Sequence, residues 1–352
     1  MKNSGSVSVF LVGDLGIHRE KPATIFHPVR EWFEQTDILI GNSEYPLTDR
    51  GQPWPGKREP IRRADPGIAR VLKEAGFTAV SLANNHAMDF GVEGILQTIE
   101  VLDESGIANA GAGRTAKEAH TPTIIEKKGV RTALLSYTSV FFPGYSATET
   151  RPGIATVRVE THYRPTPWSL DTPGVPLEAI TMPDPGDVAA MTEDVKLARA
   201  KADVVIVAWH WGIPVTAGHR GVLSYQRALG HAAIEAGADL VIGHHPHVLQ
   251  GIEVYRGRAI FHSISHFAFD APRVHVERDS LLVDCVIEDR QLAQVRLRPV
   301  LFDEDRSPVV PSADEGREVI TKLERLSAPF GTRLVRRDDI HVVDCGVETE
   351  LA

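Results

Sequence analysis

The chain has 352 residues, of which 42% are hydrophobic and 24% charged, and its formal net charge is -9. These values are ordinary for a soluble globular protein that buries a large core in one or two domains. The negative charge and the lack of a Lys/Arg cluster argue against nucleic acid or an anionic membrane surface as a partner. No run approaches the roughly 20 apolar residues of a membrane span, so we expect no membrane anchor.

The two cysteines, Cys285 and Cys345, are far apart and form no CxxC motif. This pattern suits a reducing compartment, although one disulfide between them stays open. The first apolar segment, residues 7–12, is too short for the apolar region of a signal peptide. We therefore predict a core strand there and a cytoplasmic protein.

Short apolar runs predict strands, in chain order, at residues 7–12, 37–40, 78–82, 131–137, 204–209, 240–242 and 259–262. Helices are predicted between several of them, at about residues 65–76, 92–105 and 225–236, each ending at a glycine. Strands that alternate with helices predict an α/β sheet with helices on its faces.

Residues 140–185 are rich in proline and contain several aromatic residues. We expect an irregular, lid-like insertion there, and a plain surface insertion is the alternative. After residue 280 the pattern becomes β-rich, with a hairpin at 281–287 and 292–300, a helix at 313–327 and late strands at 332–335 and 340–343. The predicted division is a catalytic core at 1–280 and a β-rich C-terminal extension at 281–352 that packs on it.

Polar motifs follow five of the predicted strands, where open α/β sheets bind their ligands. They are Gly13-Asp14, Asn42-Ser43-Glu44, Asn84-Asn85-His86 with Asp89, His210-Trp211-Gly212, and Gly243-His244-His245-Pro246-His247. Each motif alone is weak, because an Asp can cap a turn and a strand-end His can be structural. Five at one sheet edge predict a metal centre.

The residue types at this edge suggest individual roles. Asp14 is a candidate metal ligand or base, and Glu44 could bridge two metals or act as a base. The carboxamide of Asn85 is a good ligand for a hard metal, and His86 can be an acid or base that Asp89 orients.

His245 and His247 form a His-x-His pair, which would point the same way from an extended backbone, with His244 pointing oppositely. Carboxylate, carboxamide and imidazole together suit one or two divalent ions of Mn, Zn or Fe, with Ca also open. No thiolate is available to favour a structural zinc site.

The sequence resembles the CapA family of poly-gamma-glutamate synthesis proteins, within the calcineurin-like metallophosphatase superfamily. The resemblance covers roughly residues 6–330. Besides the five motifs, it rests on Arg19, Gly91, Gln226, His231, Ala236-Gly237-Ala238-Asp239, Val248, Ile260-Phe261 and Phe269-Asp270.

The resemblance implies a four-layer α/β sandwich with a two-metal site and His86 as the acid/base residue. The implied metal ligands are Asp14, Glu44, Asn85, His210, His245 and His247. Further candidates are His266 as a second acid/base residue, Arg19 as a catalytic or substrate-binding residue, and His18, Trp211, Phe142 and Tyr145 as substrate-binding residues.

Three departures set the chain apart from many relatives. Pro214-Val215 replaces a Glu-Tyr, and Ser265-His266-Phe267 replaces a Gly-Asn-Phe motif. As the third departure, we find no counterpart of the N-terminal membrane anchor that capsule members usually carry. These departures weaken the expectation of a role in capsule export, but they do not affect the expectation of a metal centre.

Three functions are considered, of which the first is favoured and the other two are alternatives. The first is epimerisation of a peptide, in which a metal polarises an amide or carboxylate oxygen and two groups exchange the Cα proton, as in lasso-peptide epimerases similar to this family. The second is metal-assisted hydrolysis of a phosphoester or amide. The third is a non-catalytic capsule protein that binds polyglutamate. The oligomeric state cannot be predicted.

Overall fold

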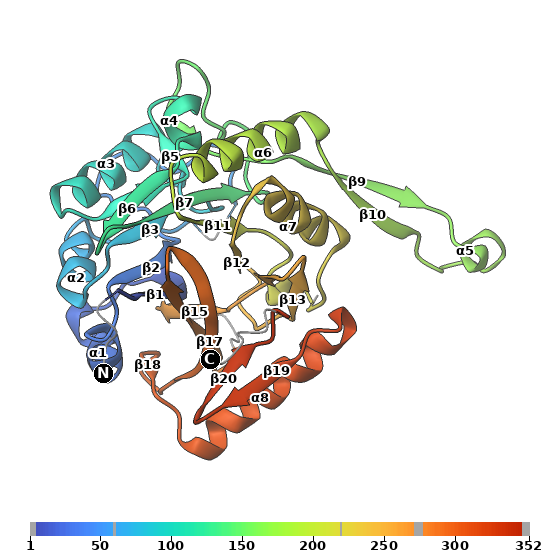
Figure 1. Cartoon of the computed structure of the whole chain (residues 1–352). Coiled ribbons are helices and arrows are strands. Elements are labelled where there is room, and N and C mark those ends of the chain that lie inside the picture. Colours follow the sequence, from blue (N-terminus) through green and yellow to red (C-terminus); the bar gives the residue numbers. More distant parts are fainter. Residues whose placement is uncertain (1–4, 59–60, 219, 271–276, 347–352) are drawn as a thin grey trace.

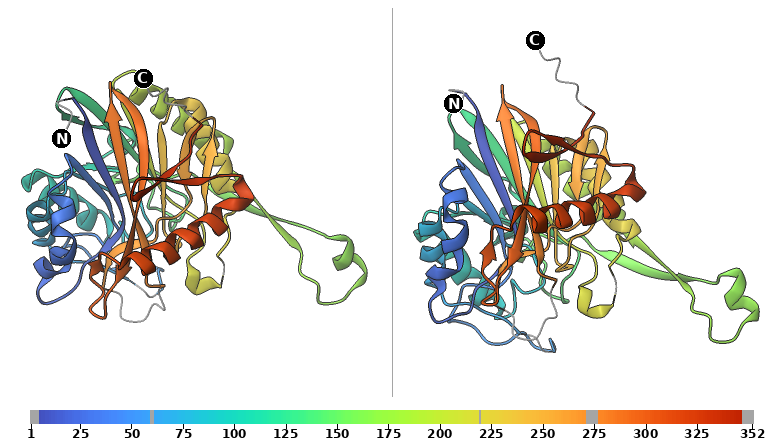
Figure 2. Two further views of the ribbon diagram at one scale, coloured as in Figure 1. Left: turned by 60° about the horizontal axis from the view of Figure 1, so that its bottom comes forward. Right: turned by 90° about the horizontal axis from the view of Figure 1, so that it is seen from below.

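The computed structural model of the chain describes residues 5–58, 61–218, 220–270 and 277–346. Two β-sheets lie face to face, and helices cover the outer face of each sheet (Figures 1 and 2). The order of the layers is helix, sheet, sheet, helix, which confirms the predicted α/β sandwich. The last six residues of the predicted C-terminal extension lie outside the described residues.

The first sheet is centred on β1, which pairs in parallel with β2 and antiparallel with β16. Helices α1 (Arg30–Phe33), α2 (Ile68–Ala75) and α3 (Gly91–Glu104) lie on its outer face. The strands of this sheet are β1 (Val7–Gly16), β2 (Ile38–Ser43), β3 (Ala79–Ser81), β4 (Ala108–Ala110), β15 (His266–Phe269), β16 (Asp279–Glu288), β17 (Gln291–Phe302), β18 (Pro308–Val309), β19 (Leu334–Arg337) and β20 (Ile340–Val343).

The second sheet has the order β13-β14-β12-β11-β7-β6, and α6 (Pro185–Arg199) and α7 (Ser224–Ala236) cover its outer face. Its strands are β6 (Thr123–Lys127), β7 (Val130–Thr138), β11 (Val204–His210), β12 (Leu240–His244), β13 (Ile252–Tyr255) and β14 (Arg258–Phe261). A small pair, β5 (Ala112–Gly113) with β8 (Gly153–Ile154), and the short helix α4 (Ala116–His120) lie beside it.

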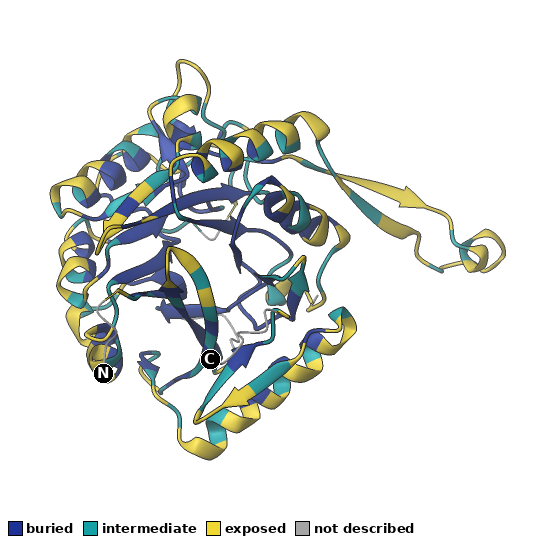
Figure 3. Cartoon of the chain, in the orientation of Figure 1, coloured by how far each residue is buried: buried dark blue, intermediate teal, exposed yellow. Residues whose placement is uncertain are grey.

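One large part of the core lies between the two sheets, where apolar side chains of both meet. Val9 and Ile40 from the first sheet belong to the same buried cluster as Ile206 and Ile242 from the second. Strands β11 and β12 are buried along their whole length (Figure 3). Parallel strands that are covered on both faces read as continuous apolar runs, which explains why the sequence marks them so clearly.

The predicted hairpin after residue 280 is present as β16 and β17, and the predicted helix at 313–327 is α8 (Ala313–Ser327). However, β16 lies next to β1 inside the first sheet. These strands therefore belong to the sheet itself, and a boundary at residue 281 would divide it. The sequence could not reveal this pairing, because a hairpin has the same apolar pattern whether it pairs with a sheet or packs against its face.

Part of the segment 140–185 is regular, which corrects the expectation of an irregular lid. Residues 159–183 form an arm, made of β9 (Val159–Arg164), α5 (Pro167–Asp171) and β10 (Glu178–Pro183). The arm extends away from the four layers and is mostly exposed (Figures 1 and 3). A lid would fold back over the body, and the arm does not.

Within the described part of the chain, no helix combines the length and the apolarity that crossing a bilayer requires.

Candidate metal centre

The strand registers bring the predicted motifs to one edge. In the first sheet, Asp14 on β1 is level with Asn42 on β2 and with His266 on β15. In the second sheet, His210 at the end of β11 is level with His244 at the end of β12. Gly13 permits this arrangement, because a Cβ there would lie 2.1 Å from the backbone oxygen of Ser265.

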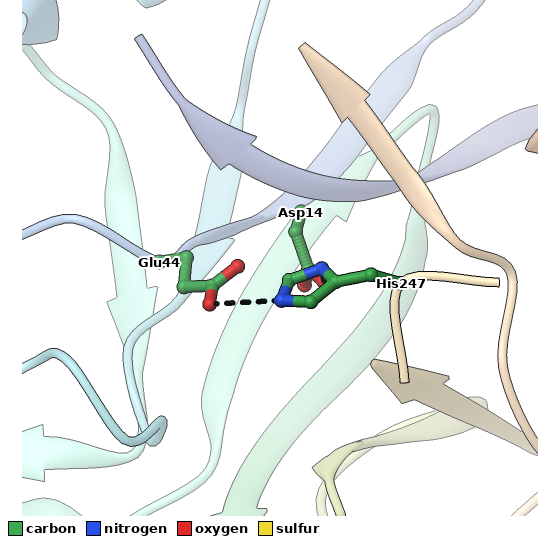
Figure 4. A group of neighbouring side chains, drawn as sticks. All are labelled: Asp14, Glu44 and His247. Carbon is green, nitrogen blue, oxygen red and sulfur yellow. Dashed lines mark ion pairs between the residues drawn. The ribbon is translucent and has the colours of Figure 1, made fainter. Parts of the chain in front are cut away.

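A first group of candidate ligands consists of Asp14, Glu44 and His247, whose ligand atoms all lie within 4.8 Å of one another (Figure 4). Nδ1 of His247 is 3.3 Å from Oδ2 of Asp14, and Nε2 is 3.6 Å from Oε1 of Glu44. The three side chains come from three separate motifs, and all three are buried.

This group fits a divalent cation on the chemistry of its donors. Both carboxylate oxygens of Glu44 are buried without a hydrogen-bond donor, and Nδ1 of His247 also has no hydrogen-bond partner. A buried carboxylate whose oxygens receive no hydrogen bond is costly, by several kcal/mol in order of magnitude, and the imidazole of His247 at 3.6 Å compensates for only part of this cost. A cation held by Asp14, Glu44 and His247 would remove that cost.

A second group adjoins the first. Nε2 of His210 lies 2.7 Å from Oδ1 of Asn85 and 3.0 Å from Nδ1 of His245. Asn42 links the groups, because its Nδ2 donates to Oδ1 of Asp14 at 2.8 Å and lies 3.4 Å from Nδ1 of His210. The six predicted ligands therefore form two adjoining sets of three, which fits one or two ions.

Burial and neighbouring charges shift the pKa values of the candidate ligands in different directions. Burial, reinforced by the charge of His247, lowers the pKa of His245 to about 3, so its ring is neutral at neutral pH. Burial and the charge of His245 likewise lower the pKa of His210. Burial raises the pKa of Glu44 to about 8. Although burial opposes it, the carboxylate of Glu44 raises the pKa of His247 to about 9.

The extended backbone predicted for His245 and His247 is not what the structure shows. Both residues have positive φ, 95° for His245 and 57° for His247, and β12 ends before them at His244. Strained backbone of this kind gathers at functional sites. The turn nevertheless brings both imidazoles to the centre. His244 points elsewhere, as expected, with its ring nitrogens 3.3 and 3.4 Å from backbone oxygens of Trp209 and Val12.

His86 lies beside the first group and is held by Asp89. Its Nδ1 is 2.7 Å from Oδ2 of Asp89, and its Nε2 is 3.9 Å from Oε1 of Glu44. The orienting role predicted for Asp89 therefore has a geometric basis. Oδ1 of Asp89 also accepts hydrogen bonds from Lys57 and, at 3.1 Å, from the hydroxyl of Tyr145.

The side chain of Arg19 is held by residues outside the two ligand groups. Its guanidinium forms a bidentate pair with Asp270, at 2.7 Å from Nη2 to Oδ1, and it also donates to Ser307. The backbone N–H of His18 donates to the same carboxylate, while the His18 side chain is exposed. Arg19 thus ties the loop after β1 to Asp270 and to the loop between β17 and β18. Its catalytic or substrate-binding role stays a prediction.

Two of the predicted substrate-binding aromatics are buried in the protein, and their binding role stays a prediction. Trp211 is fully buried, stacks on Trp209 and donates from Nε1 to the backbone oxygen of His262. Tyr145 is also fully buried and supports Asp89. Aromatic character in a motif or loop does not by itself separate core residues from binding residues. Phe142 is half-buried, with its ring centroid 5.3 Å from Nζ of Lys57.

His266 is buried next to the first group. Its ring stacks on Phe302 with centroids 4.5 Å apart and lies 5.9 Å from the ring of His247. Burial, with the charge of His247, lowers its pKa to about 3. His266 is therefore neutral at neutral pH and within reach of the centre.

Sequence reasoning missed two supporting residues. Lys57 is buried and donates from Nζ to the backbone oxygen of Asn85 at 2.7 Å, besides its pair with Asp89. A single lysine in a loop carries no signal of this kind. Asn42 lies inside a recognised motif, and its place one strand away from Asp14 could have suggested its role as a donor.

The chain matches the bacterial capsule synthesis protein family PGA_cap over residues 8–271. It belongs to this family. The match covers the metal centre and ends just after β15.

Several curated proteins align with this chain over most of its length. It is 30% identical to the capsule biosynthesis protein CapA of Bacillus anthracis, over 90% of this chain and 70% of the relative. It is 29% identical to the PGA biosynthesis protein CapA of Bacillus subtilis, over 91% and 78%. A probable polyglutamine synthesis accessory protein of Mycobacterium tuberculosis is 27% identical over 86% and 76%.

Proposed function

We propose that the chain is a metal-dependent enzyme that hydrolyses an amide bond of a polyglutamate-like or peptide substrate. The observation that carries the proposal is the convergence of Asp14, Glu44 and His247 beside the His86–Asp89 pair. The names of the relatives, which refer to capsule, PGA and polyglutamine synthesis, support a glutamate-containing polymer as the substrate class.

The site residues divide the work of amide hydrolysis between them. Asp14, Glu44 and His247, with Asn85, His210 and His245 beside them, would hold one or two divalent ions, which would supply Lewis-acid chemistry for polarising the carbonyl oxygen of the substrate. His86 is placed to move a proton at Nε2, because Asp89 holds the opposite nitrogen, Nδ1. Burial lowers the pKa of His86, although its bond to Asp89 opposes this, so the neutral ring can accept a proton.

Epimerisation of a peptide is the second candidate. It needs two groups that remove and return a Cα proton, and His266 supports it by lying beside His247. Hydrolysis is favoured because it needs one proton-transfer group, and His86 has an orienting carboxylate that His266 lacks. The only side-chain contact of a His266 ring nitrogen in the described structure is with the neighbouring Ser265 hydroxyl, at 3.5 Å.

The test incubates the metal-loaded chain with poly-γ-glutamate and, separately, with glutamyl peptides in deuterated water, followed by mass spectrometry. Hydrolysis predicts shorter products with new termini. Deuterium uptake into uncleaved peptide would instead establish epimerisation. Tight retention of the polymer with neither change would support the non-catalytic capsule role and contradict the enzyme proposal.

A further inference from the structure

The arm formed by residues 159–183 carries an unusual share of exposed apolar surface. Eight large hydrophobic side chains are exposed among the described residues, and five of them lie on the arm. These five are Tyr163, Trp168, Leu170, Leu177 and Met182, exposed by 49–76%. Exposed apolar side chains gathered on one projecting element mark an interaction surface.

The arm also has free strand edges. Strands β9 and β10 pair only with each other, as a sheet of two strands. Such a hairpin is marginally stable in water, and its unpaired backbone groups invite another strand. The base of β10 lies against α7, where the hydroxyl of Thr181 is 3.1 Å from that of Ser224. The outer edge of β9 is therefore the freer one (Figure 1).

The residues of β9 are self-complementary in charge. Glu160 and Arg164 lie two positions before and two positions after His162, and all three side chains are more than half exposed. If two β9 strands pair antiparallel about a two-fold axis at His162, Glu160 of each copy lies opposite Arg164 of the other. Opposite charges facing each other across strands stabilise a sheet.

The exposed apolar surface of the arm is large enough for a dimer interface. The five exposed side chains represent roughly 500 Å² of surface on each arm, given that a large aromatic side chain alone can bury about 150–250 Å². Two arms together offer about 1,000 Å², which is the size at which an interface becomes specific. Pairing of identical surfaces across a two-fold axis also closes the assembly at two copies.

We propose that two copies of this chain associate through their arms, with β9 pairing against β9 across a two-fold axis at His162. The result is a four-stranded sheet in which the tip of each arm, with Trp168 and Leu170, lies beside the start of β9 in the other copy. The arm carries three acidic residues, Glu160, Asp171 and Glu178, and one basic residue, Arg164. This net negative charge disfavours binding of the arm to an anionic membrane.

The first test is sedimentation velocity of the full chain over a concentration series. We expect a dimer, and the double variant Trp168→Asp/Leu170→Asp should weaken it at least about 100-fold in Kd, because it puts charges in place of two large apolar side chains that would pack on the other copy. The matched control is Val310→Asp, since Val310 is 47% exposed but lies outside the arm. Circular dichroism verifies that each variant folds.

The second test is covalent. His162→Cys places one cysteine opposite its own counterpart, within the Cα separation of about 4.4–6.8 Å that a disulfide spans. Mild oxidation should give a cross-linked dimer of His162→Cys and none of Val310→Cys. A wild-type chain that stays monomeric, or a dimer indifferent to the arm substitutions, would overturn the proposal. Monomers that bind phosphatidylcholine vesicles through Trp168 would overturn it too, with a membrane as the occupant.

Discussion

Nδ1 of His86 lies 2.7 Å from Oδ2 of Asp89, and both side chains are buried beside the candidate metal centre. This contact fixes the ring of His86 and leaves Nε2 directed toward Glu44. Lys57 and Tyr145 hold the other oxygen of Asp89. Proton transfer and metal binding are therefore assigned to neighbouring but separate residues, which can be tested separately.

Asp89→Asn should lower kcat of amide hydrolysis by about 100-fold or more, because an unoriented His86 is a poor acid/base group. Metal content should stay unchanged, since Asp89 is outside both ligand groups. The matched control is Asp194→Asn: Asp194 binds Nδ1 of His120 at 2.7 Å and the hydroxyl of Tyr137 at 2.9 Å, far from the centre in sequence. Loss of metal from Asp89→Asn would contradict this division of roles.

His247→Ala should weaken metal binding at least about 100-fold, because removing a direct ligand costs more than removing a supporting residue. The apo fold should persist, since the sandwich is built from apolar clusters independent of the ion. Elemental analysis and thermal unfolding of the metal-free chain measure the two effects. His120→Ala serves as the control, and normal metal content in His247→Ala would refute the ligand assignment.

Arg19→Ala should destabilise the fold by about 1–3 kcal/mol, the usual loss for charge-assisted hydrogen bonds. The pair of Arg19 with Asp270 is mostly buried, and Arg19 also contacts the 303–307 loop. Denaturant unfolding measures the change, and metal content should be unaffected. Wild-type stability combined with a large rise in KM would support the substrate-binding role predicted from sequence.

Glu253 gives a prediction for the dependence of stability on pH. Burial alone would raise its pKa, but hydrogen bonds from His262 and Arg227 hold the pKa below its usual range. A depressed carboxyl pKa adds stability above the unfolded value, and that stability is lost as the pH falls toward the folded value.

Glu253→Gln should therefore be less stable than the wild type by about 1–3 kcal/mol at neutral pH, because it leaves buried donors poorly matched. The difference should shrink below about pH 4.3, where unfolded glutamate protonates. Urea unfolding at several pH values measures this. A difference that grows on acidification would show that the assigned sign is wrong.

The sequence was most informative where residues are buried on both sides. The runs at 204–209 and 240–242 became β11 and β12 with little change, because parallel strands in a sandwich must be apolar throughout. The polar residues that follow them could be assigned to one edge for the same reason. A buried His210 or Asp14 at the end of such a strand has few structural explanations.

Other features depend on pairing that no local pattern encodes. Nothing in residues 279–288 reveals that β16 inserts beside β1 rather than packing on the sheet. The geometry of His245 and His247 follows from positive φ angles that their sequence does not announce. The burial of Trp211 and Tyr145 could not be predicted either, because the sequence around each does not show which residues pack against it.

The most direct test of the metal centre is a crystal of the chain reconstituted with Mn²⁺, measured at the manganese absorption edge. The account predicts an anomalous peak coordinated by Asp14, Glu44 and His247, with a second peak, if a second ion binds, at His210, Asn85 and His245. The same crystal form of His247→Ala should lose the first peak. Anomalous density only elsewhere in the chain, or none after reconstitution, would contradict the account.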